Sequence, residues 1–213
     1  MKLFWWSILV IALGAIQYLG RFTEGTPDRD VLYQYSTAVG ALIVYGFIFL
    51  CVLAIAGRQR ELLAFRRPRS WPAGLGLAFV LLVAVYAAIA VMDPLLHGAR
   101  EQGLTPTGWQ PEHAGAYAAN FVVIAGLAPL VEESLFRGLG YSLLVGYGRW
   151  LAILAVGVAF AFDHGLINAF PELMLFGSAL AWLRSRVDSI IPGLIVHSIF
   201  NAIALIAAVT VQN

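Results

Sequence analysis

The chain has 213 residues, of which 61% are apolar and only 12% charged, and its mean hydropathy is +0.83. This composition leaves too few polar side chains to cover a water-soluble globule, and the apolar segments follow one another too closely to leave room for a soluble domain of about 50 residues. Thirteen basic and 12 acidic residues give a net charge of +1, which excludes the strong charge excess of a nucleic-acid-binding protein. We therefore expect one membrane-embedded domain over residues 1–213.

Seven apolar windows approach the roughly 20-residue length that crosses a bilayer as a helix. They span residues 3–19, 32–56, 73–92, 114–144, 151–162, 173–183 and 190–211. The first window resembles the apolar centre of a signal peptide, but no Ala-x-Ala cleavage pattern follows it, which favours a retained helix. The fifth and sixth windows are short, which indicates tilted or incomplete crossings. The pattern predicts an all-α bundle with about seven transmembrane helices.

The basic residues are distributed unequally between the two sides that these windows define. A cytoplasmic N-terminus places nine of them inside and three outside, which is the asymmetry of a protein inserted in that orientation. The nine are Lys2, Arg58, Arg60, Arg66, Arg67, Arg69, Arg149, Arg184 and Arg186. Twelve of the 13 basic residues are arginine, which is typical of a GC-rich genome, so we expect a bacterial cytoplasmic membrane.

Ionisable and amide side chains interrupt the fourth and seventh windows or lie at the end of the fifth. They are Glu132, Glu133, Arg137, Asp163, His164, His197 and Asn201. Such groups are costly in lipid and point to function by default. Each one taken alone could instead hold helices together through satisfied hydrogen bonds, so only their combination indicates a functional site.

Helical spacing separates the two glutamates. Glu133 and Arg137 are four residues apart and share a helix face, which predicts a structural ion pair. Glu132 points about 100° away from Glu133, which leaves its carboxylate unpaired and suited to act as a general base.

His197 and Asn201 are also four residues apart and share one face of the last helix. A rise of 1.5 Å per residue from the inner helix ends places Glu132 and His164 roughly 20 Å deep, and His197 and Asn201 roughly 10 and 17 Å deep. These depths permit one cluster of Glu132, His164, His197 and Asn201 within the bilayer.

A carboxylate, two imidazoles and a carboxamide, without a serine or cysteine nucleophile beside a base, fit hydrolysis by activated water. Glu132 would take the proton, His164 would position the water, and His197 and Asn201 would donate to the oxyanion. The alternative is a zinc site of Glu132, His164 and His197. Because no His-Glu-x-x-His signature is present and the single cysteine, Cys51, has no partner, we prefer the metal-free mechanism.

These residues fall into three ordered motifs. Glu-Glu-x-x-x-Arg begins at Glu132, Phe-x-x-x-His runs from Phe160 to His164, and His-x-x-x-Asn from His197 to Asn201. The pattern resembles the CAAX prenyl protease family, also called the ABI or CPBP family of intramembrane proteases, which includes type II CAAX endopeptidases. The motifs lie within residues 114–211, which we expect to form the catalytic core.

The resemblance implies a helical membrane bundle with a water-filled cavity that cleaves a peptide or lipidated protein substrate near the membrane. It implies that Glu132 is the base, that His164 assists water activation, and that His197 and Asn201 form the oxyanion hole. Glu133, Arg137 and Phe160 would support the site. Both a metalloprotease and a glutamate–water mechanism are assigned to this family, so the resemblance leaves zinc open as a cofactor. Membrane lipids are the other expected partner, and nucleic acid is not expected.

Two other classes of protein compete with the protease. Chains of glutamate and histidine also serve as proton relays in transporters, but the related halves that transporters often show are absent from this sequence. A catalytically silent membrane scaffold or immunity-type protein would keep the fold without needing Glu132 for its function.

Overall fold

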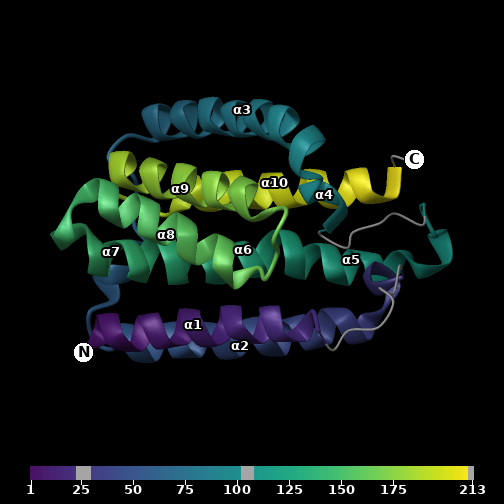
Figure 1. The fold of residues 1–213 in the computed structure, drawn as a ribbon, viewed down its shortest axis with the longest axis horizontal. Helices are drawn as coiled ribbons and strands as arrows, with labels where there is room; N and C mark the ends of the chain where they lie inside the picture. Colours follow the sequence, from purple (N-terminus) through teal and green to yellow (C-terminus); the bar gives the residue numbers. More distant parts are fainter. Residues whose placement is uncertain (23–29, 102–107, 211–213) are drawn as a thin grey trace.

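The computed structural model describes residues 1–22, 30–101 and 108–210. Within these ranges the chain forms helices joined by turns, and none of the described residues is in a strand (Figure 1). The all-α prediction is confirmed.

Each of the seven predicted windows falls on a long helical stretch. These stretches are α1(Lys2–Gly20), α2(Tyr35–Ala56), α3(Trp71–Leu96), a composite helix over residues 114–147, α8(Arg149–Asp163), α9(Phe170–Val187) and α10(Ile191–Thr210). Shorter helical turns lie at η1(Val31–Tyr33), η2(Arg60–Leu63), α4(Gly98–Glu101) and η3(Pro111–His113). Five stretches are long and apolar enough to cross a membrane, namely Lys2–Gly20, Tyr35–Ala56, Trp71–Leu96, Pro111–Tyr147 and Ile191–Thr210. The protein is therefore a multi-pass helical membrane bundle, with α8 and α9 as its shorter members.

The composite helix changes its pitch along its length. Its parts are α5(Ala114–Val122), η4(Val123–Leu127), α6(Ala128–Glu132), η5(Glu133–Gly140), α7(Tyr141–Leu144) and η6(Val145–Tyr147). Segments η4 and η5 are π-helical. π-Helical turns are rare and occur frequently at functional sites. The apolar pattern predicted one continuous helix here but contained no sign of the two π-helical segments.

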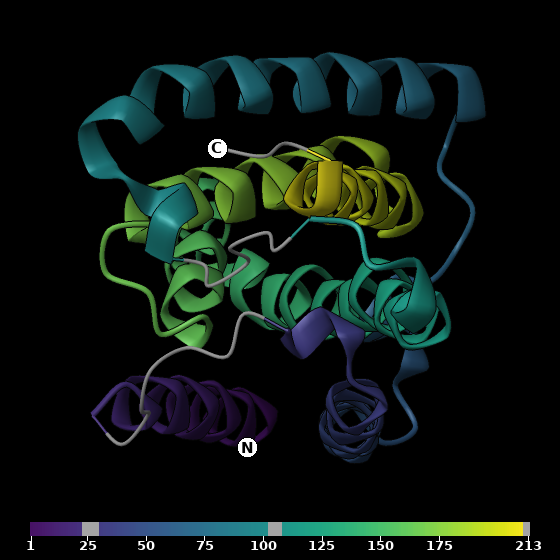
Figure 2. The same cartoon turned by 90° about the vertical axis from the view of Figure 1, so that its right-hand side faces the viewer.

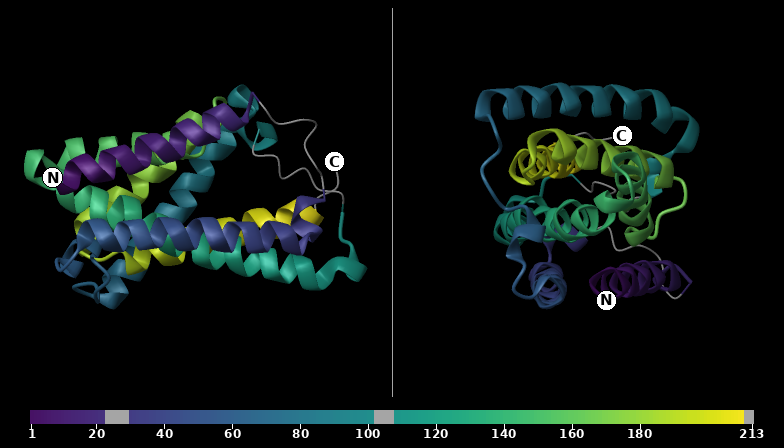
Figure 3. Two further views of the ribbon diagram at one scale, coloured as in Figure 1. Left: turned by 90° about the horizontal axis from the view of Figure 1, so that it is seen from below. Right: turned by 90° about the vertical axis from the view of Figure 1, so that its left-hand side faces the viewer.

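The helices are arranged in layers. Seen end-on in Figure 2, α3 lies alone along one side, α9 and α10 form the next layer, and the composite helix and α8 lie below them. Helices α1 and α2 cover the opposite side (Figures 1 and 2). Figure 3 shows that α3 crosses the other helices obliquely. The motif-bearing helices are therefore enclosed between α1 and α2 on one side and α3 on the other.

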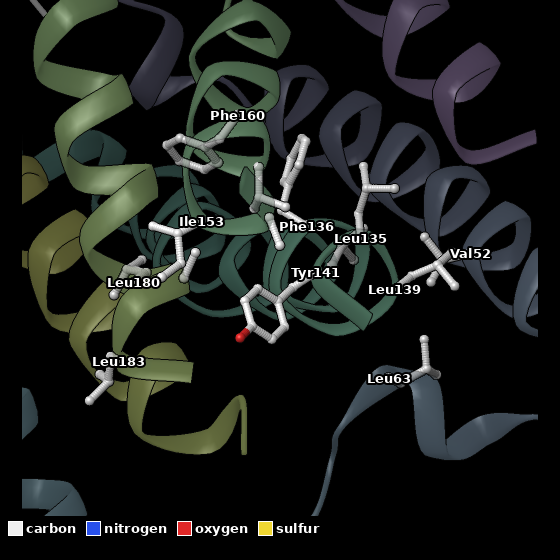
Figure 4. Packing of buried hydrophobic residues seen from close by; sticks show 14 of the residues in the cluster. Val52, Leu63, Leu135, Phe136, Leu139, Tyr141, Ile153, Phe160, Leu180 and Leu183 are labelled. Carbon is white, nitrogen blue, oxygen red and sulfur yellow. The ribbon is translucent and has the colours of Figure 1, made fainter. Parts of the chain in front are cut away.

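The core lies where the composite helix meets α8 and α9. Leu135, Phe136 and Leu139 of the composite helix are at most 1% exposed, and they pack against residues of the neighbouring helices (Figure 4). Helices α8 and α9 approach closely at Gly157 and Gly177, since a Cβ added to Gly177 would lie 3.1 Å from the Cα of Gly157. Small residues at such crossings let membrane helices pack backbone to backbone.

The segments expected on the cytoplasmic side gather at one end of the bundle. The start of α1, the connection between α2 and α3, the turn before α8 and the end of α9 all lie at this end (Figure 1). Lys2 donates to the carbonyl of Ala56 at 2.5 Å, and Arg66 pairs with Asp188 at 2.7 Å. Lys2 and Arg66 thus connect neighbouring helix ends.

Candidate active site

The four residues predicted to form one cluster line a common cavity of about 440 Å³. Glu132 ends α6, His164 follows α8 directly, and His197 and Asn201 lie one turn apart on α10. Apolar side chains, among them Ile89 of α3 and Phe176 of α9, complete the lining. The cavity is therefore polar at a few points and apolar elsewhere, which is typical of small-molecule and peptide sites.

His197 lies between the two adjacent glutamates. Its Nδ1 is 3.1 Å from Oε1 of Glu133, and its Nε2 is 3.5 Å from Oε2 of Glu132. The ring is 2% exposed and is held edge-on by Phe160 and Phe176 at centroid distances of 5.7 and 5.2 Å. Because Glu133 accepts a hydrogen bond only from a protonated Nδ1, this contact fixes which ring nitrogen faces the cavity and Glu132.

Glu133 and Arg137 form a fully buried ion pair. Arg137 Nη1 lies 3.0 Å from Glu133 Oε1, and both side chains are at most 1% exposed. Arg137 Nη2 also donates to the carbonyl of Gly177 at 3.2 Å, and its guanidinium lies 4.3 Å from the ring centroid of Phe160. This one side chain thereby connects η5 with α8 and α9.

Glu132 is not unpaired, contrary to the expectation from helical spacing. Tyr45, in the middle of α2, donates from its hydroxyl to Glu132 Oε1 at 2.9 Å. The hydroxyl reaches the glutamate across a helix interface, so spacing within one helix could not reveal it. Tyrosine in membrane helices usually lies at the membrane interface. A tyrosine far from both ends of a predicted span was therefore the one feature of the sequence that could have indicated this contact.

The contact that His164 makes restricts its tautomer. Its Nδ1 lies 2.7 Å from the backbone carbonyl oxygen of Phe160. A carbonyl oxygen only accepts, so Nδ1 carries the hydrogen and Nε2 of the neutral ring is an acceptor. His164 is thus arranged to accept a hydrogen bond from a water molecule in the cavity.

Asn201 is anchored to the first π-helical segment. Its Nδ2 donates to the carbonyl of Ile124 in η4 at 2.9 Å. An amide nitrogen carries two hydrogens, so one remains for a partner in the cavity. The contact orients the carboxamide and joins α10 to the composite helix.

The loop that follows His164 is held by residues from two distant segments. Glu101 accepts hydrogen bonds from the backbone N–H groups of Ile167, Asn168 and Ala169 at 2.6–3.0 Å, and Arg21 pairs with it at 2.7 Å. Burial alone would raise the pKa of Glu101, but these donors outweigh burial and hold its pKa below the ordinary value. No motif or apolar window in the sequence indicates that this carboxylate supports the site.

A further acidic residue, Glu172, lines the cavity and was not among the predicted site residues. It lies directly before the sixth apolar window, where it resembles an ordinary helix-end carboxylate. Its side chain is nevertheless buried in the bundle.

The donor atoms do not form a ready metal site. Across residues 1–22, 30–101 and 108–210, no three histidine, cysteine, aspartate or glutamate side chains lie close enough together to hold a metal ion. Glu132, His164 and His197, the predicted zinc ligands, are therefore not arranged as a three-residue ligand set.

The fold and the cavity define a polytopic membrane protein with a buried glutamate–histidine site. Residues 114–203 match the family model described as type II CAAX prenyl endopeptidase Rce1-like. All three motifs lie within these residues. The resemblance predicted from those motifs is confirmed over these residues. Comparison with curated proteins and with solved structures gave no match.

Proposed function

We propose that the protein is an intramembrane endopeptidase that hydrolyses peptide bonds of membrane-associated or prenylated substrates through water activated by Glu132. The observation that carries the proposal is the position of Glu132 and His197 side by side in the cavity that His164 and Asn201 also line. The arginine-rich composition further supports the cytoplasmic membrane of a bacterium as its location.

In the proposed reaction a water molecule lies between Glu132 and Nε2 of His164. Glu132 takes one proton from the water, and the oxygen forms a bond to the scissile carbonyl carbon. The carbonyl oxygen becomes an oxyanion, which accepts hydrogen bonds from His197 and Asn201. Glu132 then returns the proton to the leaving nitrogen as the carbon–nitrogen bond breaks.

Glu133 and Arg137 serve this reaction indirectly. Glu133 holds Nδ1 of His197, so Nε2 is the only ring nitrogen that can reach the oxyanion. Donation from Nε2 therefore requires a ring with hydrogens on both nitrogens. Arg137 and Phe160 keep Glu133 and the two imidazoles in place.

The proposal is tested by cleavage of membrane-anchored and prenylated peptides by the purified protein. We expect Glu132→Gln to lower kcat about 10²-fold or more while the melting temperature stays near that of the wild type. Glu112→Gln, which changes an exposed carboxylate, is the matched control and should retain activity. Each protein is assayed with and without a chelator, because a metal-dependent reaction would lose its rate and the glutamate–water mechanism would not.

Two outcomes would contradict parts of this proposal. If Glu132→Gln cleaves as fast as the wild type, Glu132 is not the base. If the wild type cleaves no peptide and Glu132→Gln leaves the cellular phenotype unchanged, the scaffold function is favoured in place of the protease.

A further inference from the structure

Glu172 carries a buried carboxylate that the proposed reaction does not use. It is the third residue of α9, its side chain lines the cavity that contains Glu132 and His164, and the residue is only 4% exposed. Its Oε1 has no hydrogen-bond partner among the residues that the structure describes. A buried acceptor without a donor is unfavourable, so this oxygen indicates that a donor enters the cavity with a ligand.

The charges around the cavity indicate which kind of donor fits. Glu132 and Glu172 contribute two carboxylates, and no lysine or arginine is among the described side chains that line the cavity. Arg137, the nearby buried cation, is paired with Glu133 outside the lining. A cationic group from a ligand would therefore be favoured here, and an anionic group disfavoured.

The backbone of α4 lies directly against this carboxylate. A Cβ added to Gly98 would lie 2.7 Å from Oε2 of Glu172 and 3.0 Å from the Cα of Ala169. Because Gly98 has no side chain, the carboxylate of Glu172 can occupy this space. An alanine at this position would displace the carboxylate while keeping its charge.

We propose that Glu172 is a specificity-determining residue that binds a lysine or arginine side chain of the peptide substrate within the cavity that contains Glu132. The aliphatic stem of such a side chain would pack against Leu166 and Leu173, which line the same cavity, while its charged end donates to the carboxylate. The inference rests on the proposed endopeptidase function, because it assumes a peptide ligand.

Binding to an inactive protein tests the inference separately from catalysis. In the Glu132→Gln background, fluorescence anisotropy measures binding of membrane-anchored peptides that differ at one position, which carries lysine, norleucine or glutamate. Separate peptide sets place this varied residue at each successive position of the segment next to the anchor. Norleucine keeps the aliphatic stem of lysine and lacks its charge, so the ratio of the two dissociation constants isolates the charge.

At one position we expect the lysine peptide to bind about tenfold or more tightly than the norleucine peptide, and the glutamate peptide to bind most weakly. Adding Glu172→Gln should bring the lysine-to-norleucine ratio close to one. Adding Glu112→Gln should leave the ratio unchanged. Adding Gly98→Ala should lower it, which provides a second variant if Glu172→Gln does not fold.

Equal binding of lysine and norleucine peptides at every position, or a preference that persists in both Glu172→Gln and Gly98→Ala, would overturn the inference. Cleavage by the wild type is scored independently. Cleavage without a lysine preference contradicts only the role of Glu172, whereas Glu172-dependent binding without any cleavage contradicts only the endopeptidase.

Discussion

The imidazole of His197 separates two carboxylates that adjoin in the sequence. One belongs to a fully buried ion pair and the other faces the cavity, so consecutive glutamates have different surroundings. Their difference follows from the helix geometry, because consecutive side chains diverge by about 100°. Substitution of Glu132 is therefore expected to affect stability and activity differently from substitution of Glu133.

Tyr45→Phe tests the contact that α2 makes with the proposed base. The variant removes only the hydroxyl that donates to Glu132. We expect kcat to fall about tenfold, since a lost hydrogen bond to a charged group is worth about 1.5–3 kcal/mol. Steady-state kinetics on the cleaved peptide measure this. Tyr117→Phe, which loses a hydrogen bond to the carbonyl of Leu205 instead, is the control, and an equal loss in both variants would contradict a specific role for Tyr45.

The candidate site could be predicted from the sequence only as far as spacing within helices allows. The pairing of Glu133 with Arg137 follows from a separation of four residues, and Glu132, His164, His197 and Asn201 stood out because polar groups are rare in apolar segments. Tyr45 and Glu101 reach the site from other segments of the chain. No local pattern encodes such contacts, because they depend on which helices meet.

At the scale of elements, the crossing of α8 and α9 sets the position of Phe160 and therefore of His164. A Cβ at Gly157 would lie 2.9 Å from the backbone nitrogen of Ser178 and 3.0 Å from the carbonyl oxygen of Met174. These are backbone atoms, so the two helices would have to separate to accept a larger side chain.

We therefore expect Gly157→Ala to destabilise the protein by about 1–3 kcal/mol. We also expect it to lower the cleavage rate more than a surface substitution that reduces the free energy of unfolding by the same amount. Thermal unfolding in detergent and peptide cleavage measure the two effects. Gly76→Ala in α3 is the control, because no described atom outside the neighbouring backbone of its own helix lies within 4 Å of its added Cβ. If the two variants unfold at the same temperature, close packing at Gly157 is not required.

The contact of Glu101 with the loop before α9 predicts a pH dependence of stability. The pKa of Glu101 is lowered in the folded protein by its backbone donors and Arg21, against the opposing effect of burial. Its stabilising contribution is therefore fully present above the ordinary glutamate value of about 4.3, and it is lost as the pH falls through the lowered pKa.

Glu101→Gln should accordingly be less stable than the wild type at pH 7, by about 1.5–3 kcal/mol. The difference should shrink as the pH falls below about 4. Melting temperatures recorded across this pH range provide the measurement. A difference that stays constant down to the lowest pH would show that the charge of Glu101 does not contribute.

The elements themselves were largely predictable, since long apolar windows require helices in a bilayer. All seven windows fall on helices, and their boundaries agree within four residues. The largest differences are at the ends of the third and sixth windows, where the helices continue for four more residues. The second helix begins three residues after the start of its window. There, residues 32–34 lie in or after the separate turn η1. The π-helical segments were not predictable, because their extra residue per turn leaves no mark on a uniformly apolar pattern.

For the molecule as a whole, the collection of basic segments at one end of the bundle favours a cytoplasmic N-terminus. In a Cys51→Ala background, we expect Glu112→Cys to react with an impermeant maleimide on intact cells and Arg67→Cys to react only after permeabilisation. Both positions are exposed and lie on opposite sides of the predicted topology. Labelling of Arg67→Cys in intact cells would show that the protein has the opposite orientation.

The two π-helical segments also constrain how the composite helix can vary in length. Segments η4 and η5 lie on either side of Glu132, and each provides a contact of the site, through the carbonyl of Ile124 and through Arg137. A π-helical turn holds one more residue than an α-helical turn, so a one-residue deletion within either segment is absorbed when the segment reverts to α-helix. A one-residue deletion within α6, which lies between them, cannot be absorbed in this way and would turn the following side chains by about 100° relative to the preceding ones. The contact of Asn201 with Ile124 and those of Glu133 could then no longer be kept together. Length changes in the composite helix are therefore expected in the π-helical segments and not in α6.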